Sequence, residues 1–136
     1  MKVLIADDEQ VYRSFIRRLL AKDSDVDVVG EAVDGEEAVS LSKQLKPDVV
    51  LMNLEMPGVD GLEATRRLKE SHGGTKVIMV SDSGDEASRQ AAAKCGADAF
   101  FLKSADISHL MSAIRQGFRA GSPLLSTRPE EPWKGR

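Results

Sequence analysis

The sequence predicts a doubly wound α/β fold around a five-stranded parallel sheet. Five short apolar runs alternate with five amphipathic stretches, a pattern typical of βαβ units. Three of the runs are apolar without interruption, as expected of parallel strands buried on both faces: Val3–Ile5, Val49–Met52 and Val77–Val80. Gly, Asp and Pro stand between the runs, where turns are needed.

The expected strands are the apolar runs with their immediate neighbours. In chain order they are Lys2–Ala6, Val26–Ala32, Asp48–Met52, Lys76–Val80 and Ala97–Leu102. We expect the first, third and fourth to be central, because these contain the uninterrupted apolar runs.

Five helices are expected between and after the strands, each with apolar residues at helical spacing on the face that covers the sheet. The five predicted faces are Val11, Phe15, Ile16, Leu19 and Leu20; Ala38, Val39, Leu41, Ser42 and Leu45; Leu62, Thr65 and Leu68; Ala87, Ala91 and Ala92; and Ile107, Leu110, Met111, Ile114 and Phe118.

Loop residues support the helix boundaries. Asp34 and Asp60, each followed by Gly, stand where the second and third helices are expected to open, and Gly96 stands where the fourth ends. After Gly121 the periodicity stops and Ser, Pro and charged residues dominate. We therefore expect one domain over residues 1–120, followed by a linker or disordered tail over residues 121–136.

Composition excludes several classes of function. A chain of 136 residues suits a single domain, and its formal net charge of −3 provides no positive field for binding nucleic acid directly. Cys95 is the only cysteine, so no intrachain disulfide is expected. The N-terminal apolar run is too short for a signal peptide or membrane span, and we expect a cytoplasmic protein without membrane contact.

Polar side chains follow four of the expected strands. Asp7 and Asp8 follow the first, Asn53 the third, Ser81 the fourth and Lys103 the fifth. Ligands of open parallel sheets bind outside the carboxyl ends of the strands, so these groups should converge. Adjacent carboxylates suit Mg²⁺, while a hydroxyl and an ammonium can donate hydrogen bonds to a phosphoryl group.

Asn53 gives this predicted site its unusual character. An ionised Asp at position 53 could attack phosphorus, whereas the Asn amide is neutral and its nitrogen lone pair is delocalised. The sequence thus predicts a phosphate cradle without a nucleophile. Taken singly, the residues also have plainer interpretations. Asp7 and Asp8 could be a solvated loop pair or a cap of the first helix, and Ser81 could cap the fourth. Lys103 could be an ordinary surface lysine, and Asn53 a satisfied polar residue.

The run PDVVLMNLEMPGVDG, Pro47–Gly61, resembles the signature of response-regulator receiver domains with one residue changed. Val3–Glu9 resembles the opening strand and acidic pair of that family, and Gly96–Ser104 resembles its last strand and lysine. The resemblance is closest to receivers of the NarL/FixJ type. It implies a CheY-like, flavodoxin-like (βα)5 sandwich with strand order 2-1-3-4-5.

The resemblance also implies roles for individual residues at a metal site. Asp8 would ligate Mg²⁺ directly and Asp7 mainly through water. The backbone carbonyl of Glu55 would supply a third protein contact. Asn53 stands at the phosphoacceptor position, which also borders the metal, so we expect Mg²⁺ binding to be weakened.

Three further residues receive roles by resemblance. Lys103 would hold a phosphoryl oxygen, Ser81 would be the switch hydroxyl, and Phe100 stands where the family carries its switch aromatic. Phe100 and Phe101 are adjacent in a strand, so their side chains should point to opposite faces, and one or both are plain core residues on the alternative interpretation.

The implied function is that of a non-enzymatic receiver of a two-component system. It would take phosphate from a sensor histidine kinase to control an output such as transcription, with DNA contacted only through an effector domain absent from this chain. Asn53 would make this form incapable of phosphorylation. The alternative is a pseudo-receiver that acts as a protein-interaction module or homodimer through its last helices. An enzyme acting on a small phosphorylated substrate is disfavoured, because no general base is evident at the strand ends.

Overall fold

The computed structural model describes residues 1–104 and 107–116, in which five strands and five helices alternate. The strands are β1 (Lys2–Ala6), β2 (Asp27–Ala32), β3 (Val49–Asn53), β4 (Lys76–Ser81) and β5 (Ala99–Leu102). The helices are α1 (Gln10–Leu20), α2 (Gly35–Leu45), α3 (Gly61–Ser71), α4 (Glu86–Cys95) and α5 (Ile107–Gln116). The expected tail over residues 121–136 and the predicted core residue Phe118 lie outside the described residues.

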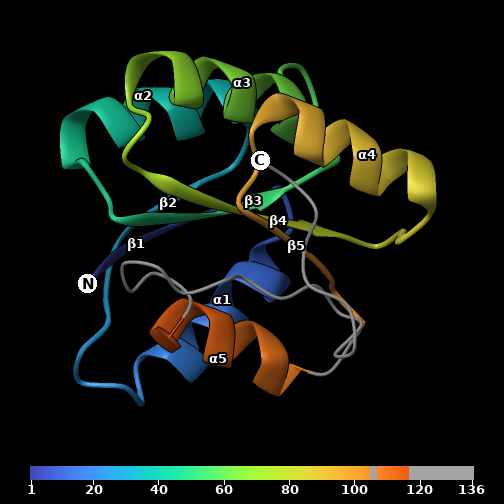
Figure 1. The fold of residues 1–136 in the computed structure, drawn as a ribbon. Helices are drawn as coiled ribbons and strands as arrows, with labels where there is room; N and C mark the ends of the chain where they lie inside the picture. Colours follow the sequence, from blue (N-terminus) through green and yellow to red (C-terminus); the bar gives the residue numbers. More distant parts are fainter. Residues whose placement is uncertain (105–106, 117–136) are drawn as a thin grey trace.

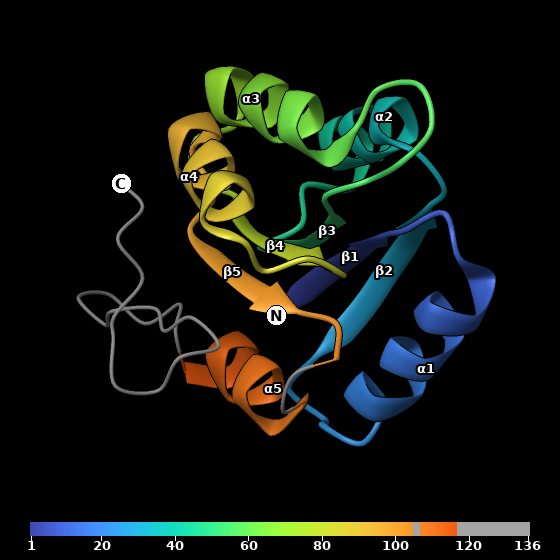
Figure 2. The same cartoon turned by 90° about the vertical axis from the view of Figure 1, so that its right-hand side faces the viewer.

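The five strands form one parallel sheet in the order β2-β1-β3-β4-β5. Helices α1 and α5 cover one face, and α2, α3 and α4 cover the other (Figures 1 and 2). This confirms the doubly wound α/β fold, and β1, β3 and β4 are the inner strands, as predicted. Every residue of β3 is buried, because this strand has neighbours on both edges and helices on both faces.

Alternation along the strands sends neighbouring side chains into two separate cores. Phe100 packs with Leu4 and Met52 on the face covered by α2, α3 and α4. Phe101 packs with Ile5 and Ile16 on the face covered by α1 and α5. Phe100 and Phe101 are both almost fully buried, with exposed fractions of 0% and 1%. The expected opposite orientation of this pair is confirmed.

The predicted core face of α1 is partly wrong. Ile16 and Leu20 are buried as expected, but Val11 is 84% exposed and Phe15 is 45% exposed. The packed face includes Tyr12 in their place. Because residues one position apart lie about 100° around a helix, a stripe centred on Tyr12, Ile16 and Leu20 turns Val11 and Phe15 toward solvent. Leu19 is partly buried against this core, as expected.

The other corrections concern α4 and the strand ends. Ala87 is exposed, and the buried positions of α4 are Arg89 and Ala92. β2 and β3 each begin one residue later than predicted, and β5 begins two residues later. β3 and β4 each extend one residue further, so that Asn53 and Ser81 are the last residues of their strands. Their backbones are therefore fixed by the sheet.

Aspartates cap three of the helices. The carboxylates of Asp34, Asp60 and Asp85 each accept a hydrogen bond from the backbone N–H three residues later, and Gly96 ends α4 in the left-handed conformation. The first two caps and the glycine were predicted. The interpretation of Ser81 as the cap of the fourth helix is wrong, because Asp85 has that role.

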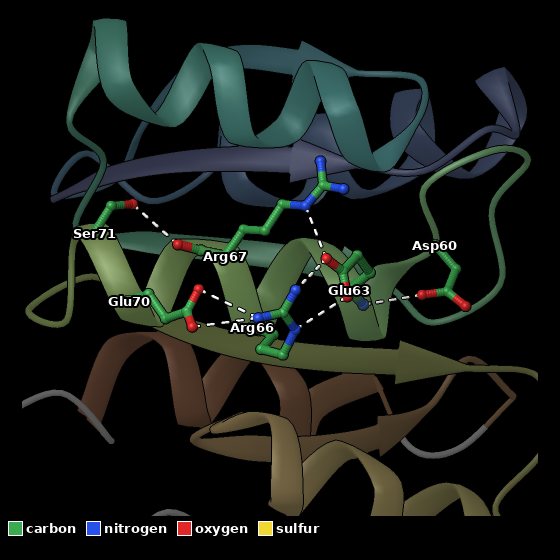
Figure 3. A network of polar contacts seen from close by, with 6 residues as sticks. All are labelled: Asp60, Glu63, Arg66, Arg67, Glu70 and Ser71. Atoms are coloured by element: carbon green, nitrogen blue, oxygen red, sulfur yellow. Dashed lines mark hydrogen bonds and ion pairs between the residues drawn. The ribbon is translucent and has the colours of Figure 1, made fainter.

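The outer face of α3 carries a network of ion pairs (Figure 3). Glu63 pairs with both Arg66 and Arg67, and Arg66 also contacts Glu70. Hydrogen bonds from the two arginines lower the pKa of Glu63 to about 2. Such exposed pairs add little to stability. Their effect here is that both arginine charges are matched within the same helix.

Candidate functional site

The predicted site residues converge at the carboxyl end of the sheet. Asp7 directly follows β1, Asn53 and Ser81 end β3 and β4, and Lys103 follows β5. The backbone N–H of Lys103 donates to the carbonyl of Ser81 at 2.8 Å, which joins the last two strand ends. Four segments distant in sequence thus meet at one edge, as the topology of a parallel sheet requires.

Lys103 and Asp7 form the buried charged pair of the site. The Lys103 Nζ lies 2.8 Å from Asp7 Oδ2 and 3.0 Å from Glu9 Oε1, and 4.5 Å from the centre of the Tyr12 ring. The side chains of Lys103 and Asp7 are only 7% and 2% exposed. The ammonium is therefore held between two carboxylates and an aromatic face.

Burial and pairing act in opposite directions on these charges. Burial alone would lower the pKa of Lys103, but hydrogen bonds with Asp7 and Glu9 overcome this effect and raise it. For Asp7, burial raises the pKa, and the hydrogen bonds from Lys103 and from the Glu9 backbone oppose that effect. We conclude that Lys103 keeps its charge.

Asp7 also orders the start of α1, although not as a helix cap. Its Oδ1 accepts from the backbone N–H of Glu9 at 2.8 Å, and its carbonyl accepts from Arg13 Nη1 at 2.8 Å. The N-cap residue of α1 is Glu9, whose side chain makes no cap hydrogen bond. The interpretation of Asp7 and Asp8 as a cap of the first helix is therefore wrong.

Asn53 uses its amide nitrogen to join two acceptors. Nδ2 donates to Asp8 Oδ1 at 3.2 Å and to the backbone carbonyl of Glu55 at 2.6 Å. A carbonyl can only accept a hydrogen bond, and so can an ionised carboxylate, so chemistry requires the nitrogen rather than the oxygen of the amide at this position. Asn53 itself is 5% exposed.

This arrangement bears directly on a metal ion. The Asp8 carboxylate and the Glu55 carbonyl are hard oxygen donors of the kind that Mg²⁺ prefers. In this structure, however, the Asn53 N–H group already binds both oxygens, which leaves them directed at a donor. A cation could use these two oxygens only after the Asn53 amide releases them. Within residues 1–104 and 107–116, no cluster of three or more His, Cys, Asp or Glu side chains is suited to a metal.

Ser81 is linked to the side chain of Glu55. Its hydroxyl donates to Glu55 Oε1 at 2.9 Å and accepts from the backbone N–H of Ser83 at 3.1 Å. Ser81 is completely buried, whereas Glu55 is exposed at the rim. The hydroxyl expected to contact a phosphoryl oxygen thus contacts a carboxylate of the same chain.

Phe100 lies beneath this rim in the core, with Arg89 of α4 stacked 5.0 Å from the centre of its ring.

Four groups in or near the site have no role in the sequence prediction: Glu9, Tyr12, the Glu55 carboxylate and Arg89. Glu9 extends the acidic pair and was the easiest to find from the sequence. Nothing in the local pattern marks Arg89 as a buried arginine.

A family model described as the response regulator receiver domain matches residues 3–115. Among curated relatives, the response regulator GacA of Pseudomonas aeruginosa is 40% identical over 126 residues, which are 93% of this chain and 58% of GacA. The nitrate/nitrite response regulator NarL of Escherichia coli is 36% identical over 124 residues, 91% of this chain and 57% of NarL. The chain therefore spans somewhat over half the length of these relatives.

Solved structures of similar fold support the same family. The receiver domain of NarL from Mycobacterium tuberculosis has a TM-score of 0.82 at 31% identity, covering 88% of this chain and 96% of that one. A chain of the CheX–CheY–BeF3–Mg²⁺ complex from Borrelia burgdorferi has a TM-score of 0.81 at 26% identity, covering 88% of this chain and 90% of that one.

None of the described helices is long and apolar enough to cross a membrane.

The strand order, the polar edge and the family match over residues 3–115 lead to one conclusion. This chain belongs to the response-regulator receiver family and is a NarL/FixJ-type receiver domain of two-component signalling.

Proposed function

We propose that this receiver domain does not accept a phosphoryl group, because Asn53 stands at the phosphoacceptor position. The observation that supports this proposal most directly is the pair of hydrogen bonds from Asn53 Nδ2 to Asp8 and to the Glu55 carbonyl. The side chain presents an amide donor where an ionised carboxylate would be needed as the nucleophile. Asp7, Asp8, Ser81 and Lys103, which lie at the same end of the sheet, would form the rest of the phosphate cradle.

Intact mass after incubation with acetyl phosphate and Mg²⁺ tests this proposal. We expect no adduct on the native chain and a phosphoryl adduct on the Asn53→Asp variant. An adduct on the native chain that is abolished by Asn53→Ala would contradict the proposal. An adduct on neither chain would favour the pseudo-receiver, a module that acts through protein contacts alone.

The pseudo-receiver is retained as a second candidate because of one feature of the site. The cradle donors have acceptors within the chain: Ser81 has Glu55, and Lys103 has Asp7 and Glu9. The hydrogen-bond donors of such a site therefore need no phosphoryl group as an acceptor. On this alternative, the C-terminal helices would serve as the docking or homodimer face, which analytical ultracentrifugation of the chain would test.

Mg²⁺ binding belongs to the same proposal. The CheY complex from Borrelia contains Mg²⁺ together with BeF3. By analogy, the site here would use the carboxylates of Asp7 and Asp8 and the Glu55 carbonyl, with Asn53 beside them. We propose that the ion binds weakly, because the Asn53 amide must first release Asp8 and Glu55.

The wider setting follows from the relatives. We propose a sensor histidine kinase as the upstream partner, and control of transcription through a DNA-binding effector domain outside this chain. A DNA-binding response regulator of the LuxR family from Staphylococcus aureus, whose solved structure is similar to this chain, supports the second part. The domain itself would be a non-enzymatic signalling module in the cytoplasm. Co-purification of a full-length protein with promoter DNA, compared with this chain alone, would test the division of roles.

A further inference from the structure

The inference concerns the side chain of Glu55, which the family resemblance leaves without a role. Only its backbone carbonyl is implicated at the metal site. In the structure, its carboxylate extends from the loop after β3 and accepts the hydroxyl hydrogen of Ser81 at 2.9 Å. Ser81 is fully buried at the end of β4, so its hydroxyl has few directions in which to find an acceptor.

The contacts of Ser81 fix the direction of this hydrogen bond. The backbone N–H of Ser83 donates to the Ser81 oxygen at 3.1 Å. That contact uses one of the two lone pairs of the hydroxyl, and an ionised carboxylate can only accept, so the single hydroxyl hydrogen is the group that faces Glu55. At this position the Ser81 hydroxyl would otherwise donate its hydrogen bond to a phosphoryl oxygen, which is also an anionic acceptor.

The other cradle donor is engaged in the same way. Lys103 contacts the carboxylates of Asp7 and Glu9 in the same chain. The Asn53 amide likewise donates to Asp8 and to the Glu55 carbonyl within the chain.

We propose that the Glu55 carboxylate is an internal substitute for the phosphoryl group. It occupies the anion position beside Ser81, holds that strand end in one arrangement without phosphorylation, and competes with external phosphoryl-type anions. This inference rests on the proposed function, in which Asn53 makes the site incapable of phosphorylation. It assigns to Glu55 the hydrogen bond from Ser81 that a phosphoryl oxygen would otherwise accept.

The first test is a double-mutant cycle in the native chain. Glu55→Ala, Ser81→Ala and the double variant are compared by urea unfolding. Substitution at position 55 leaves the backbone carbonyl and its bond with Asn53 in place. We expect the two substitutions to be coupled by about fivefold or more in the unfolding equilibrium constant, as for a hydrogen bond to a charged group. Additive effects would overturn the proposal.

The second test measures competition directly. The probe is beryllium fluoride with Mg²⁺, titrated into Asn53→Asp and into Asn53→Asp/Glu55→Ala, and read by the amide NMR signals of Ser83 and Lys103. Removing Glu55 should tighten binding by about fivefold, whereas Glu36→Ala, at an exposed position of α2, should leave it unchanged. Equal affinity with and without Glu55 would overturn the proposed competition.

The two tests separate the two proposals. If Asn53→Asp does not bind beryllium fluoride with or without Glu55, the proposed function fails. Restoring the acceptor carboxylate would then not have restored a working receiver site. The cycle in the native chain still decides the role of Glu55 in that case, since it needs neither metal nor probe.

Discussion

The ammonium of Lys103 and the carboxylate of Asp7 lie 2.8 Å apart, and both side chains are more than nine-tenths buried. A buried ion pair adds little net stability, because both ions have lost their hydration. Removing one partner is different, since the other charge is then left buried and unpaired. This pair is therefore the point at which the site and the stability of the fold are linked most tightly.

Lys103→Met should reduce the free energy of unfolding by about 3 kcal/mol, because it leaves the Asp7 carboxylate buried without its cation. Urea unfolding at neutral pH measures this change. Lys94→Met, at an exposed position of α4, is the matched control and should change stability by less than about 0.5 kcal/mol. Similar decreases in the free energy of unfolding of the two variants would mean that the stability of the fold does not depend on this ion pair.

Asn53→Asp should bind Mg²⁺ more tightly than the native chain and be less stable without it, by roughly 1 kcal/mol. The added charge places three carboxylates near one lysine and replaces the amide donor that now satisfies Asp8 and Glu55. Isothermal titration with Mg²⁺ and urea unfolding in EDTA measure the two effects. Equal affinities would contradict the role assigned to the amide.

Gly61→Ala should destabilise the domain by roughly 2 kcal/mol or more and disturb Asn53. A Cβ atom at position 61 would lie 2.1 Å from the backbone oxygen of Asn53, so the third strand end or the start of α3 must move. Gly74→Ala is the control, because no described atom lies within 4 Å of its added Cβ. Thermal unfolding and the Asn53 side-chain NMR signals should change in the first variant only.

Tyr12 should ionise only at unusually high pH. Burial raises its pKa from the ordinary value of 10.0 to about 12, although the Lys103 charge opposes this shift. The fold favours the neutral phenol, so this contribution to stability is complete below about pH 10 and is lost as the pH rises toward 12. The chain has one tyrosine, so tyrosinate absorbance reports on this group alone.

The control for this titration is the same measurement in urea. There the midpoint should return to about 10, because the unfolded chain no longer buries the ring. A folded midpoint near 10 would show that the Tyr12 hydroxyl is open to water, in conflict with the packing of α1 on the sheet.

The sequence by itself determined the fold class and the residues that meet at the strand ends. Uninterrupted apolar runs require strands buried on both faces, and a parallel sheet then places the residues after each run at one edge. Asp7, Asn53, Ser81 and Lys103 could therefore be found from order and chemistry alone, and the Asp–Gly pairs located the starts of α2 and α3.

Only the tertiary structure decided which groups contact one another. Helical spacing did not separate Val11 from Tyr12, because the rotation of α1 is set by the sheet on which it packs. Arg89 of α4 is buried with its guanidinium 5.0 Å from the centre of the Phe100 ring in β5, a contact between two elements. The contacts of Asn53 with Asp8 and of Glu55 with Ser81 join strand ends distant in sequence. Hydrogen bonds depend on positions to within tenths of an ångström, which a local sequence pattern does not specify.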